Sequence, residues 1–414
     1  MFFRCGLTIA CASLLLTLPG QVPSSPAANA QQTLPAPSGS YAIGQAVFDW
    51  EDKTRVDEFA SSPGQHRELM VYLWYPSRTP GSTLTSEYFP AAREIDKNVP
   101  AREAAKDIFG QSWPEIVAGS LRSHAVFGAR VATERGGFPV ILFSPGASAS
   151  SFSYTAQIEN FVSHGYVVVA IDHPGLSGLI RFADGHVRLY HSDEPPSPSQ
   201  DPLQAMINSA KIGTQSAAED LSFVLDKLSQ IRSPLRRAMN LDRVAAVGHS
   251  AGGTVSVRAC QLDTRIKACV SEDGEVSPVG AFFDYPDHPQ LSQPFLLIQI
   301  AEQHTDEELK RMGESREVWN AYVEHEHMQL SRCPPGSYLV TIIRSGFGHS
   351  AFSDGPSLNA QQGSPEASAT HTNLLLTEDL ERVFLDQILK SNADHTLASF
   401  SAPLGYLKIQ PIGR

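Results

Sequence analysis

Ser250 lies in a Gly-x-Ser-x-Gly pattern, and residues 244–253 read Val-Ala-Ala-Val-Gly-His-Ser-Ala-Gly-Gly. The apolar run before the serine predicts a short buried strand, and the small residues after it can begin a helix. At such a junction a serine hydroxyl stands exposed above a sheet, where it can attack a carbonyl carbon. Side chains at Gly248 and Gly252 would collide with the neighbouring strand and helix. Although a glycine-flanked serine can be a simple turn or cap residue, this context predicts that Ser250 is a nucleophile.

His349 is the best candidate for the base that this serine needs. A serine hydroxyl is a weak nucleophile until a base takes its proton, and a third group must orient that base. Residues 338–343 read Tyr-Leu-Val-Thr-Ile-Ile, which predicts a strand, and a glycine-containing loop then leads to His349. Such a loop can carry an imidazole over the serine. In folds with this serine turn, the histidine is the last of the three residues along the chain.

The carboxylate that orients the histidine has three candidates. Residues 266–270 predict the next strand after the serine, and Asp273 follows it closely. Residues 294–300 predict a further strand, which Glu302 and Asp306 follow. Either strand end could supply the carboxylate, because the carboxyl ends of parallel strands lie along one edge of a sheet. These residues could equally be a turn aspartate and solvated residues that open a helix, so the choice stays open at this point.

Apolar runs alternate with helical patterns, as in a mostly parallel sheet flanked by helices. Strands are expected at residues 69–75, 138–143, 166–171, 243–247, 266–270, 294–300 and 338–343, and helices at 153–164, 214–231 and 374–389. Two insertions, near residues 86–130 and 178–212, interrupt this alternation. The first carries an amphipathic stripe, which predicts helices packed on the core or, alternatively, a lid or lipid-facing surface. The second is polar and contains proline, which predicts a mobile rim.

The motifs together resemble the platelet-activating factor acetylhydrolase family, the group VII phospholipases A2 of the plasma and intracellular type II kind. The resemblance covers residues 45–390 in collinear order and rests on segments at 75–77, 87–89, 138–146, 163–173, 247–250, 293–295 and 343–349. It implies an α/β-hydrolase fold with cap or rim insertions. It also implies that Asp273 is the acid, and that the backbone amides of Ala147 and Ala251 form an oxyanion hole.

The resemblance implies a serine esterase without a metal or organic cofactor, acting on a small-molecule or lipid ester such as a short-acyl phospholipid. The family usually has an aromatic residue after the nucleophile and a histidine before the oxyanion glycine, whereas this chain has Ala251 and Pro145. These smaller residues should reshape the acyl pocket. One alternative is a general carboxylesterase or polyester hydrolase; a polyester hydrolase would use Glu302 or Asp306 as its acid. Another is a hydrolase-fold protein that binds without catalysis.

The N-terminal sequence predicts a cleavable secretory signal over residues 1–30. One positive charge precedes an apolar run at 5–18, and the small residues 28–30 fit a cleavage site. The apolar run is shorter than the ~20 residues that a membrane-spanning helix needs. We therefore expect a secreted or periplasmic protein without a stable membrane anchor. Residues 31–44 are expected to be a flexible linker, and residues 45–414 a single catalytic domain.

The composition of the chain limits the classes of molecule that the protein is expected to bind. The formal net charge of −12 over 414 residues argues against nucleic acids and anionic membranes, and leaves room only for transient contact with a lipid interface. Beyond the signal, the cysteines are Cys260, Cys269 and Cys333, an odd number that allows at most one disulfide bond. Residues 324–327 read Glu-His-Glu-His, but histidines two positions apart point to different sides of a helix. We therefore expect no metal site there.

Overall fold

The computed structural model describes residues 34–413, apart from residues 61, 79–84, 191–201, 275–289, 302–304, 313–314, 361–363, 393–395 and 402–404. The side chains of residues 202–208, 312 and 322 are likewise outside the description. The expected signal peptide over residues 1–30 lies outside the described residues, and export of the protein stays a prediction.

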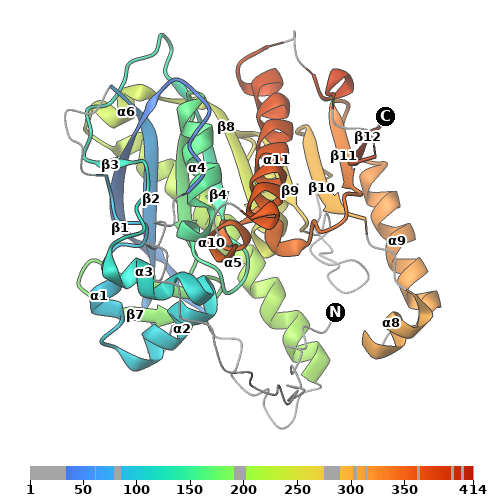
Figure 1. Cartoon of the computed structure of the whole chain (residues 1–414), viewed down its shortest axis with the longest axis horizontal. Helices are drawn as coiled ribbons and strands as arrows, with labels where there is room; N and C mark the ends of the chain where they lie inside the picture. The colour runs from blue at the N-terminus through green and yellow to red at the C-terminus, as the bar shows by residue number, and fades with distance from the viewer. Residues whose placement is uncertain are drawn as a thin grey trace, which may run out of the picture.

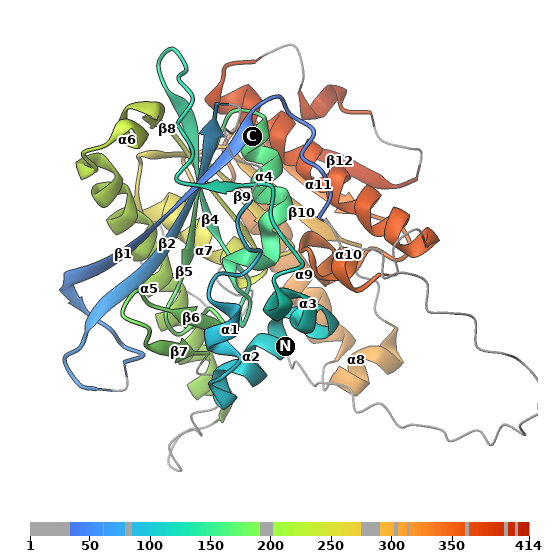
Figure 2. The ribbon, with the colours of Figure 1, turned by 60° about the vertical axis from the view of Figure 1, so that its left-hand side comes forward.

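A ten-stranded sheet forms the centre of the described structure, in the order β12-β11-β10-β9-β8-β4-β5-β2-β1-β3 (Figures 1 and 2). Its strands are β1 (Ala42–Val56), β2 (His66–Ser77), β3 (Val126–Phe127), β4 (Phe138–Ser144), β5 (Val167–Asp172), β8 (Met239–His249), β9 (Ile266–Glu272), β10 (Phe295–Ile300), β11 (Ser337–Ile342) and β12 (Leu407–Ile412). The strands from β5 across to β11 pair in parallel. The pairs β1–β2, β2–β5 and β11–β12 are antiparallel. The mostly parallel sheet expected from the sequence is thereby confirmed.

Helices cover both faces of this sheet (Figure 1). The core on one face is shared with α4 (Thr155–Ser163) and α11 (Pro365–Leu389), and the core on the other face with α5 (Pro202–Gln230) and α7 (Ala251–Leu262). Successive residues of a strand enter opposite cores: Ile141 and Phe143 lie with α4 and α11, whereas Val140 and Leu142 lie with α5 and α7. Because both faces are covered, the central strands read as continuous apolar runs, which is why the sequence revealed them.

Shorter helices and a hairpin complete the described fold. The helices are α6 (Pro234–Ala238), α8 (Asp306–Met312), α9 (Arg316–Leu330) and α10 (Gly355–Asn359), and the 3-10 turns are η2 (Ser151–Tyr154), η3 (His349–Phe352) and η4 (Leu397–Ser399). Strands β6 (Leu179–Arg181) and β7 (Val187–Leu189) pair as a separate antiparallel hairpin. Among the described residues, no helix is long and apolar enough to cross a membrane.

Residues 92–118 of the insertion at 86–130 form a compact helical group at one end of the molecule (Figure 2), and residues 126–127 return to the sheet as β3. The group contains α1 (Ala92–Ile95), α2 (Val99–Phe109), η1 (Gly110–Ser112) and α3 (Trp113–Ala118). The apolar side chains of Phe109, Trp113 and Ile116 are buried and belong to the same core as α4 and α11. The amphipathic stripe is thus a core-facing surface, the first of the two interpretations given above.

Residues 31–44 were expected to be a flexible linker, but from Leu34 onward the structure differs from this expectation. Leu34 is buried in the core, the amide of Gly39 donates to Ser163 Oγ over 2.9 Å, and β1 begins at Ala42. The backbone lies so close to α4 that a Cβ on Gly39 would be 2.2 Å from Ser163 O. Serine and glycine here serve close packing rather than flexibility.

The insertion at residues 178–212 was likewise only partly anticipated. It begins with the hairpin β6–β7, and its last residues already belong to α5, which starts at Pro202 rather than near residue 214. The polar residues that suggested a mobile rim are therefore largely hairpin and helix surface in the described part of the insertion.

Candidate active site

Ser250 occupies a sharp turn between β8, which ends at His249, and α7, which begins at Ala251. Its backbone angles are φ 55° and ψ −124°, a conformation that side-chain-bearing residues rarely adopt. The amide of Ser250 donates to Glu272 O over 2.8 Å, which joins the turn to the end of the neighbouring strand β9. Strain of this kind persists only where surrounding contacts enforce it, and it is typical of functional positions.

The glycines around Ser250 are required by close packing, as the sequence suggested. A Cβ on Gly248 would lie 2.3 Å from Gly252 O, and a Cβ on Gly252 would lie 2.1 Å from Ser144 O. A Cβ on Gly274 would lie 2.2 Å from Ser250 O. Contacts under 3 Å cannot be relieved where the opposing atom is backbone, so these positions exclude side chains.

Asp273 and His349 meet beside this turn. Asp273 follows β9, has a φ of 50°, and its amide donates to Ile298 O over 2.6 Å. Its Oδ1 accepts from the amide of Ile300 over 3.0 Å, and its Oδ2 lies 2.6 Å from Nδ1 of His349. The carboxylate is therefore held from two sides and faces the imidazole with its second oxygen.

The contact with Asp273 fixes the tautomer of His349. A carboxylate accepts, so Nδ1 carries the proton and Nε2 presents a lone pair. Among the described residues Nε2 has no hydrogen-bond partner, and the side chain is 38% exposed. The ring of His249, the residue before Ser250, lies 4.6 Å from the ring of His349 between centroids. The structure thus brings the three predicted residues Ser250, Asp273 and His349 to one place.

Of the two alternative acids, the structure describes only Asp306, and this residue is engaged elsewhere. Asp306 is the first residue of α8, its side chain is 81% exposed, and it pairs with Arg316 Nε at 2.8 Å. Glu302 lies outside the described residues. Asp273 is accordingly the carboxylate that contacts His349.

Two residues that sequence reasoning did not single out support the arrangement. The hydroxyl of Tyr154 lies 2.8 Å from Nδ1 of His249 and accepts a hydrogen bond of 3.1 Å from the amide of Gly146. Burial is the main cause that lowers the pKa of His249 to about 3. His249 is therefore neutral, and its Nδ1 accepts a hydrogen bond from the hydroxyl of Tyr154. Tyr154 has no sequence signal, because its contacts join residues far apart in the chain.

The two amides expected to bind an oxyanion belong to segments next to Ser250. Ala251 follows the serine at the start of α7, and Ala147 lies in the loop after β4. A Cβ on the neighbouring Gly146 would lie 3.4 Å from Ser250 Cβ, so this loop borders the serine closely. Among the described residues, neither amide has a hydrogen-bond acceptor, so both are available to a developing negative charge.

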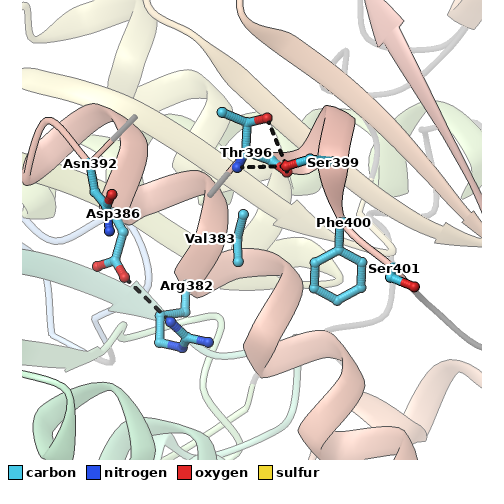
Figure 3. Close-up of a pocket in the computed structure, with 8 residues that line it drawn as sticks. All are labelled: Arg382, Val383, Asp386, Asn392, Thr396, Ser399, Phe400 and Ser401. Atoms are coloured by element: carbon cyan, nitrogen blue, oxygen red, sulfur yellow. Dashed lines mark hydrogen bonds and ion pairs between the residues drawn. The ribbon is translucent and has the colours of Figure 1, made fainter. Parts of the chain in front are cut away.

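A cavity lies in a different part of the described structure. This cavity of about 420 Å³ between α11 and η4 is bordered by Arg382, Asp386 and Phe400 (Figure 3). Its polar groups bond one another, since Arg382 pairs with Asp386 at 3.4 Å. In the described residues no group of histidine, cysteine, aspartate or glutamate could hold a metal ion. Cys260, Cys269 and Cys333 are buried free thiols.

The geometry agrees with the comparison to known proteins. Residues 141–396 match the family described as "Alpha/beta hydrolase family". The chain belongs to the alpha/beta hydrolase family. Residues 26–187 also match the family described as "Platelet-activating factor acetylhydrolase, isoform II", which confirms the resemblance drawn from the sequence motifs.

Relatives of this alpha/beta hydrolase include esterases. A probable 1-alkyl-2-acetylglycerophosphocholine esterase of Arthroderma benhamiae is 26% identical over 64% of this chain and 64% of its own length. The platelet-activating factor acetylhydrolase of Bos taurus is 23% identical over 60% of this chain and 57% of its own. The chain thus spans less than two thirds of these curated relatives. The solved structure of a ferulic acid esterase from Streptomyces cinnamoneus matches with a TM-score of 0.68 and 25% identity, over 92% of this chain and 99% of that one.

Proposed function

We propose that this alpha/beta hydrolase is a serine carboxylic-ester hydrolase in which Ser250, His349 and Asp273 form the catalytic triad. The observation that carries the proposal is the 2.6 Å contact between Asp273 Oδ2 and His349 Nδ1 beside the strained serine turn. An imidazole oriented by a carboxylate, beside a half-buried serine at a strained turn, is the arrangement that nucleophilic ester hydrolysis uses.

The reaction follows from these positions. Nε2 of His349 takes the Ser250 proton as Oγ bonds to the ester carbonyl carbon, and the carbonyl π electrons move onto oxygen. The amides of Ala147 and Ala251 donate to that oxyanion, and each such donor is typically worth about 3–4 kcal/mol. The imidazolium returns its proton to the alkoxide leaving group as the C–O bond breaks. Water, deprotonated by His349, then hydrolyses the acyl-enzyme and restores Ser250.

Short-acyl esters, including phospholipids with a short acyl chain, are the proposed substrate class. The match of residues 26–187 to the acetylhydrolase family and the name of the fungal relative support this choice. We also propose that residues 1–30 direct export, that contact with lipid is transient, and that no metal or organic cofactor takes part.

A general carboxylesterase is the second candidate, and the likeness to the ferulic acid esterase structure favours it because that match spans nearly the whole chain. The small residues at Ala251 and Pro145 also leave room for an acyl group other than acetyl. A polyester hydrolase using Asp306 fits less well, since Asp306 pairs with Arg316. A purely binding protein has no need of the complete Ser250, His349 and Asp273 set.

The decisive experiment measures hydrolysis of p-nitrophenyl esters from acetate to palmitate by residues 31–414, with EDTA present and absent. Activity with a short-chain optimum, unchanged by EDTA and lost in Ser250→Ala, is expected. The matched control is Ser353→Ala, which changes a serine in the loop after η3 and should retain activity. Substantial turnover by pure, folded Ser250→Ala protein would overturn the proposal, whereas a long-chain optimum would replace the acetylhydrolase-like substrate class with the carboxylesterase one.

A further inference from the structure

A second set of serine, histidine and aspartate lies beneath the loop that carries Ala147. Ser144 Oγ lies 3.1 Å from His173 Nε2, and His173 Nδ1 lies 2.9 Å from Asp220 Oδ2. They come from the end of β4, the loop after β5, and α5. All three side chains are fully buried. The atoms follow the order of a catalytic relay, yet an ester cannot reach Ser144 here.

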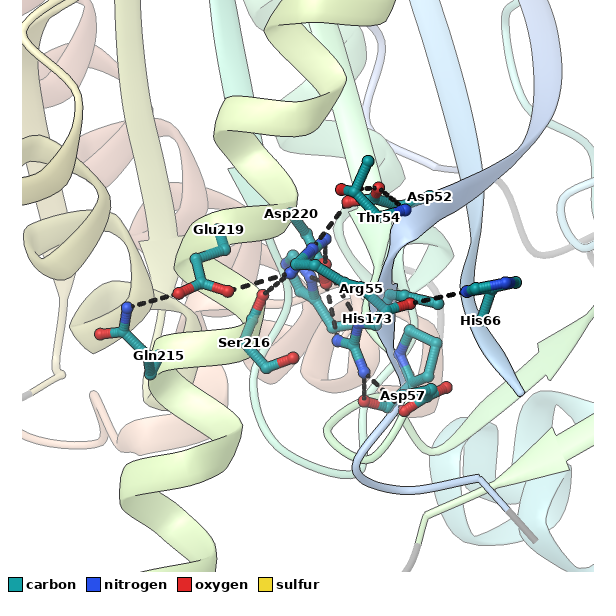
Figure 4. A network of polar contacts seen from close by, with 12 residues as sticks. Asp52, Thr54, Arg55, Asp57, His66, His173, Gln215, Ser216, Glu219 and Asp220 are labelled. Carbon is teal, nitrogen blue, oxygen red and sulfur yellow. Dashed lines mark hydrogen bonds and ion pairs between the residues drawn. The ribbon is translucent and has the colours of Figure 1, made fainter. Parts of the chain in front are cut away.

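Charges around Asp220 determine which nitrogen of His173 carries the proton. Burial by itself would raise the pKa of Asp220, but the charge of Arg67 and the hydrogen bonds from His173 and Arg67 hold that pKa below its usual range. Arg67 donates to both carboxylate oxygens, at 3.0 and 2.7 Å. Arg55 donates to the same carboxylate at 2.6 Å, and Figure 4 shows Arg55, His173 and Asp220 together. Burial also lowers the pKa of His173. His173 is therefore neutral. Its Nδ1–H donates a hydrogen bond to Asp220, and its Nε2 accepts a hydrogen bond from the hydroxyl of Ser144.

The loop after β5 is fastened to the loop after β4 by backbone contacts as well. The amide of Ser148 donates to Leu176 O over 2.8 Å, and the amide of Gly178 donates to Ala149 O over 2.8 Å. A Cβ on Gly178 would lie 2.2 Å from Ser148 O. Ser148 has a φ of 57°, which costs free energy unless neighbouring contacts maintain it. The conformation of residues 145–149 therefore depends on the loop that begins at His173.

We propose that Ser144, His173 and Asp220 are positioning residues that hold the loop at 145–149, and with it the Ala147 amide, in place for an oxyanion. This inference rests on the proposed function and extends it. This series of side-chain contacts begins at Arg67, a buried cation that is itself held by Asp57. It ends at Ser144, which immediately precedes the loop. An oxyanion donor must lie within a few tenths of an ångström of its ideal place, so a buried anchor of this kind acts on the rate of the chemical step.

The test compares Ser144→Ala with Ser337→Ala. Both changes remove a buried serine hydroxyl, but Ser337 lies at the start of β11, where its Oγ donates to Pro334 O and accepts from the amide of Phe295. For Ser144→Ala, kcat on a p-nitrophenyl ester is expected to fall about tenfold while KM changes by less than about twofold. For Ser337→Ala, kcat should stay within about twofold of the unmodified protein, because the carboxyl ends of the strands, where the site lies, are unaffected.

Hydrogen exchange tests the anchor without relying on turnover. Amides in a peptide covering residues 145–150 should exchange faster in Ser144→Ala than in the unmodified protein, while peptides from α9 exchange at unchanged rates. If the two serine variants are indistinguishable in kcat and in exchange of this peptide, the inference is overturned. A general rise in exchange, with kcat and KM altered alike in both variants, also overturns it. Absence of esterase activity in the unmodified protein would overturn the proposed function instead, and exchange of residues 145–150 would then decide the anchor alone.

Discussion

The two Ser-His-Asp sets differ in access and in what surrounds the carboxylate. His349 is 38% exposed, whereas His173 is fully buried. Asp273 accepts from a backbone amide and from His349, and no arginine contacts it among the described residues. Asp220 instead receives hydrogen bonds from Arg55 and Arg67. A carboxylate without an arginine partner can stabilise the imidazolium that forms during ester hydrolysis, whereas one already neutralised by two arginines has little charge left to offer.

The comparison teaches that residue types alone do not define a catalytic site. In the functions that we propose, the same three types of side chain serve nucleophilic attack in one place and hold a loop in position in the other. What separates them is whether a substrate can reach the serine and whether the histidine can change its protonation state at modest cost.

Removal of His349 should break the reactive set most severely. In His349→Ala no base accepts the Ser250 proton, and kcat should fall by a factor of about 10⁴ or more. Steady-state hydrolysis of a short p-nitrophenyl ester, with circular dichroism to verify folding, measures this. A loss of less than about tenfold would mean that another group acts as the base.

Asp273→Asn should lower kcat by about 10³–10⁴. The asparagine oxygen would keep the bond to the Ile300 amide, so its NH2 group would replace Oδ2, cannot accept from Nδ1–H and favours the wrong tautomer of His349. Asp306→Asn is the matched control and should change kcat by less than about twofold, since Asp306 pairs only at the surface with Arg316. The reverse result, with the larger loss in Asp306→Asn, would move the acid to the strand end after β10.

A fluorophosphonate probe should separate the two serines directly. It should label Ser250 stoichiometrically and leave Ser144 unmodified, because the first is activated and accessible and the second is buried. Peptide mass spectrometry after digestion identifies the labelled residue. Label found on Ser144 in native protein would show that burial does not distinguish the two sets.

Tyr154→Phe should produce a smaller loss, of about tenfold in kcat, because the amide of Gly146 loses its acceptor and His249 loses its donor. KM should change less than kcat if the tyrosine aligns the loop before Ala147. Kinetics of Tyr166→Phe supply the control, since that hydroxyl bonds Asp386 instead. Equal effects of the two changes would argue against a role for Tyr154 at the site.

The last prediction concerns stability rather than catalysis, and in particular the pH dependence of stability. Gln157 Nε2 donates to both Glu272 and Glu381, which are fully buried behind Asp273 without a cationic partner in the described structure. Burial raises the pKa of Glu381 to about 7 and also raises that of Glu272. A carboxyl whose folded-state pKa exceeds its unfolded value stabilises the fold at low pH, and this stability is lost as pH rises.

The free energy of unfolding should therefore decline between about pH 4.5 and pH 7, by up to about 1.4 kcal/mol per pH unit for one proton. The thermal midpoint should decline with it. Glu381→Gln should flatten this decline, because the amide cannot ionise. Scanning calorimetry across this range measures both proteins. An equally steep decline in the variant would show that the Glu272–Glu381 pair does not hold a proton.

The sequence was sufficient for the elements that carry continuous apolar runs, and it pointed to Ser250 and His349 as site residues because their local patterns are distinctive. Asp273 needed the family resemblance, because Glu302 and Asp306 had equal standing on local grounds. Strands β1 and β12 were missed because they lie near or at the edges of the sheet and mix polar with apolar residues. The start of α11 was missed because Ser364 and Pro365 resemble a loop, although they are an N-cap and a first-turn proline.

The anchor of the oxyanion loop could not be read from the sequence for a different reason. Ser144 and His173 are 29 positions apart, and His173 and Asp220 are 47 apart. No local periodicity relates them, and their contact exists only after β4, β5 and α5 have packed. The same applies to Tyr154 and His249, which are separated by 95 positions.

The packing of residues 34–41 against α4 has a practical meaning for recombinant production. A truncated chain that began after Tyr41 would lack Leu34, whose side chain is 3% exposed. It would also lose the hydrogen bond from the amide of Gly39 to Ser163 Oγ. Apolar core surface exposed by the loss of Leu34 would favour aggregation in the expression host. An affinity tag is therefore better joined ahead of Leu34, with cleavage sites placed on that side as well.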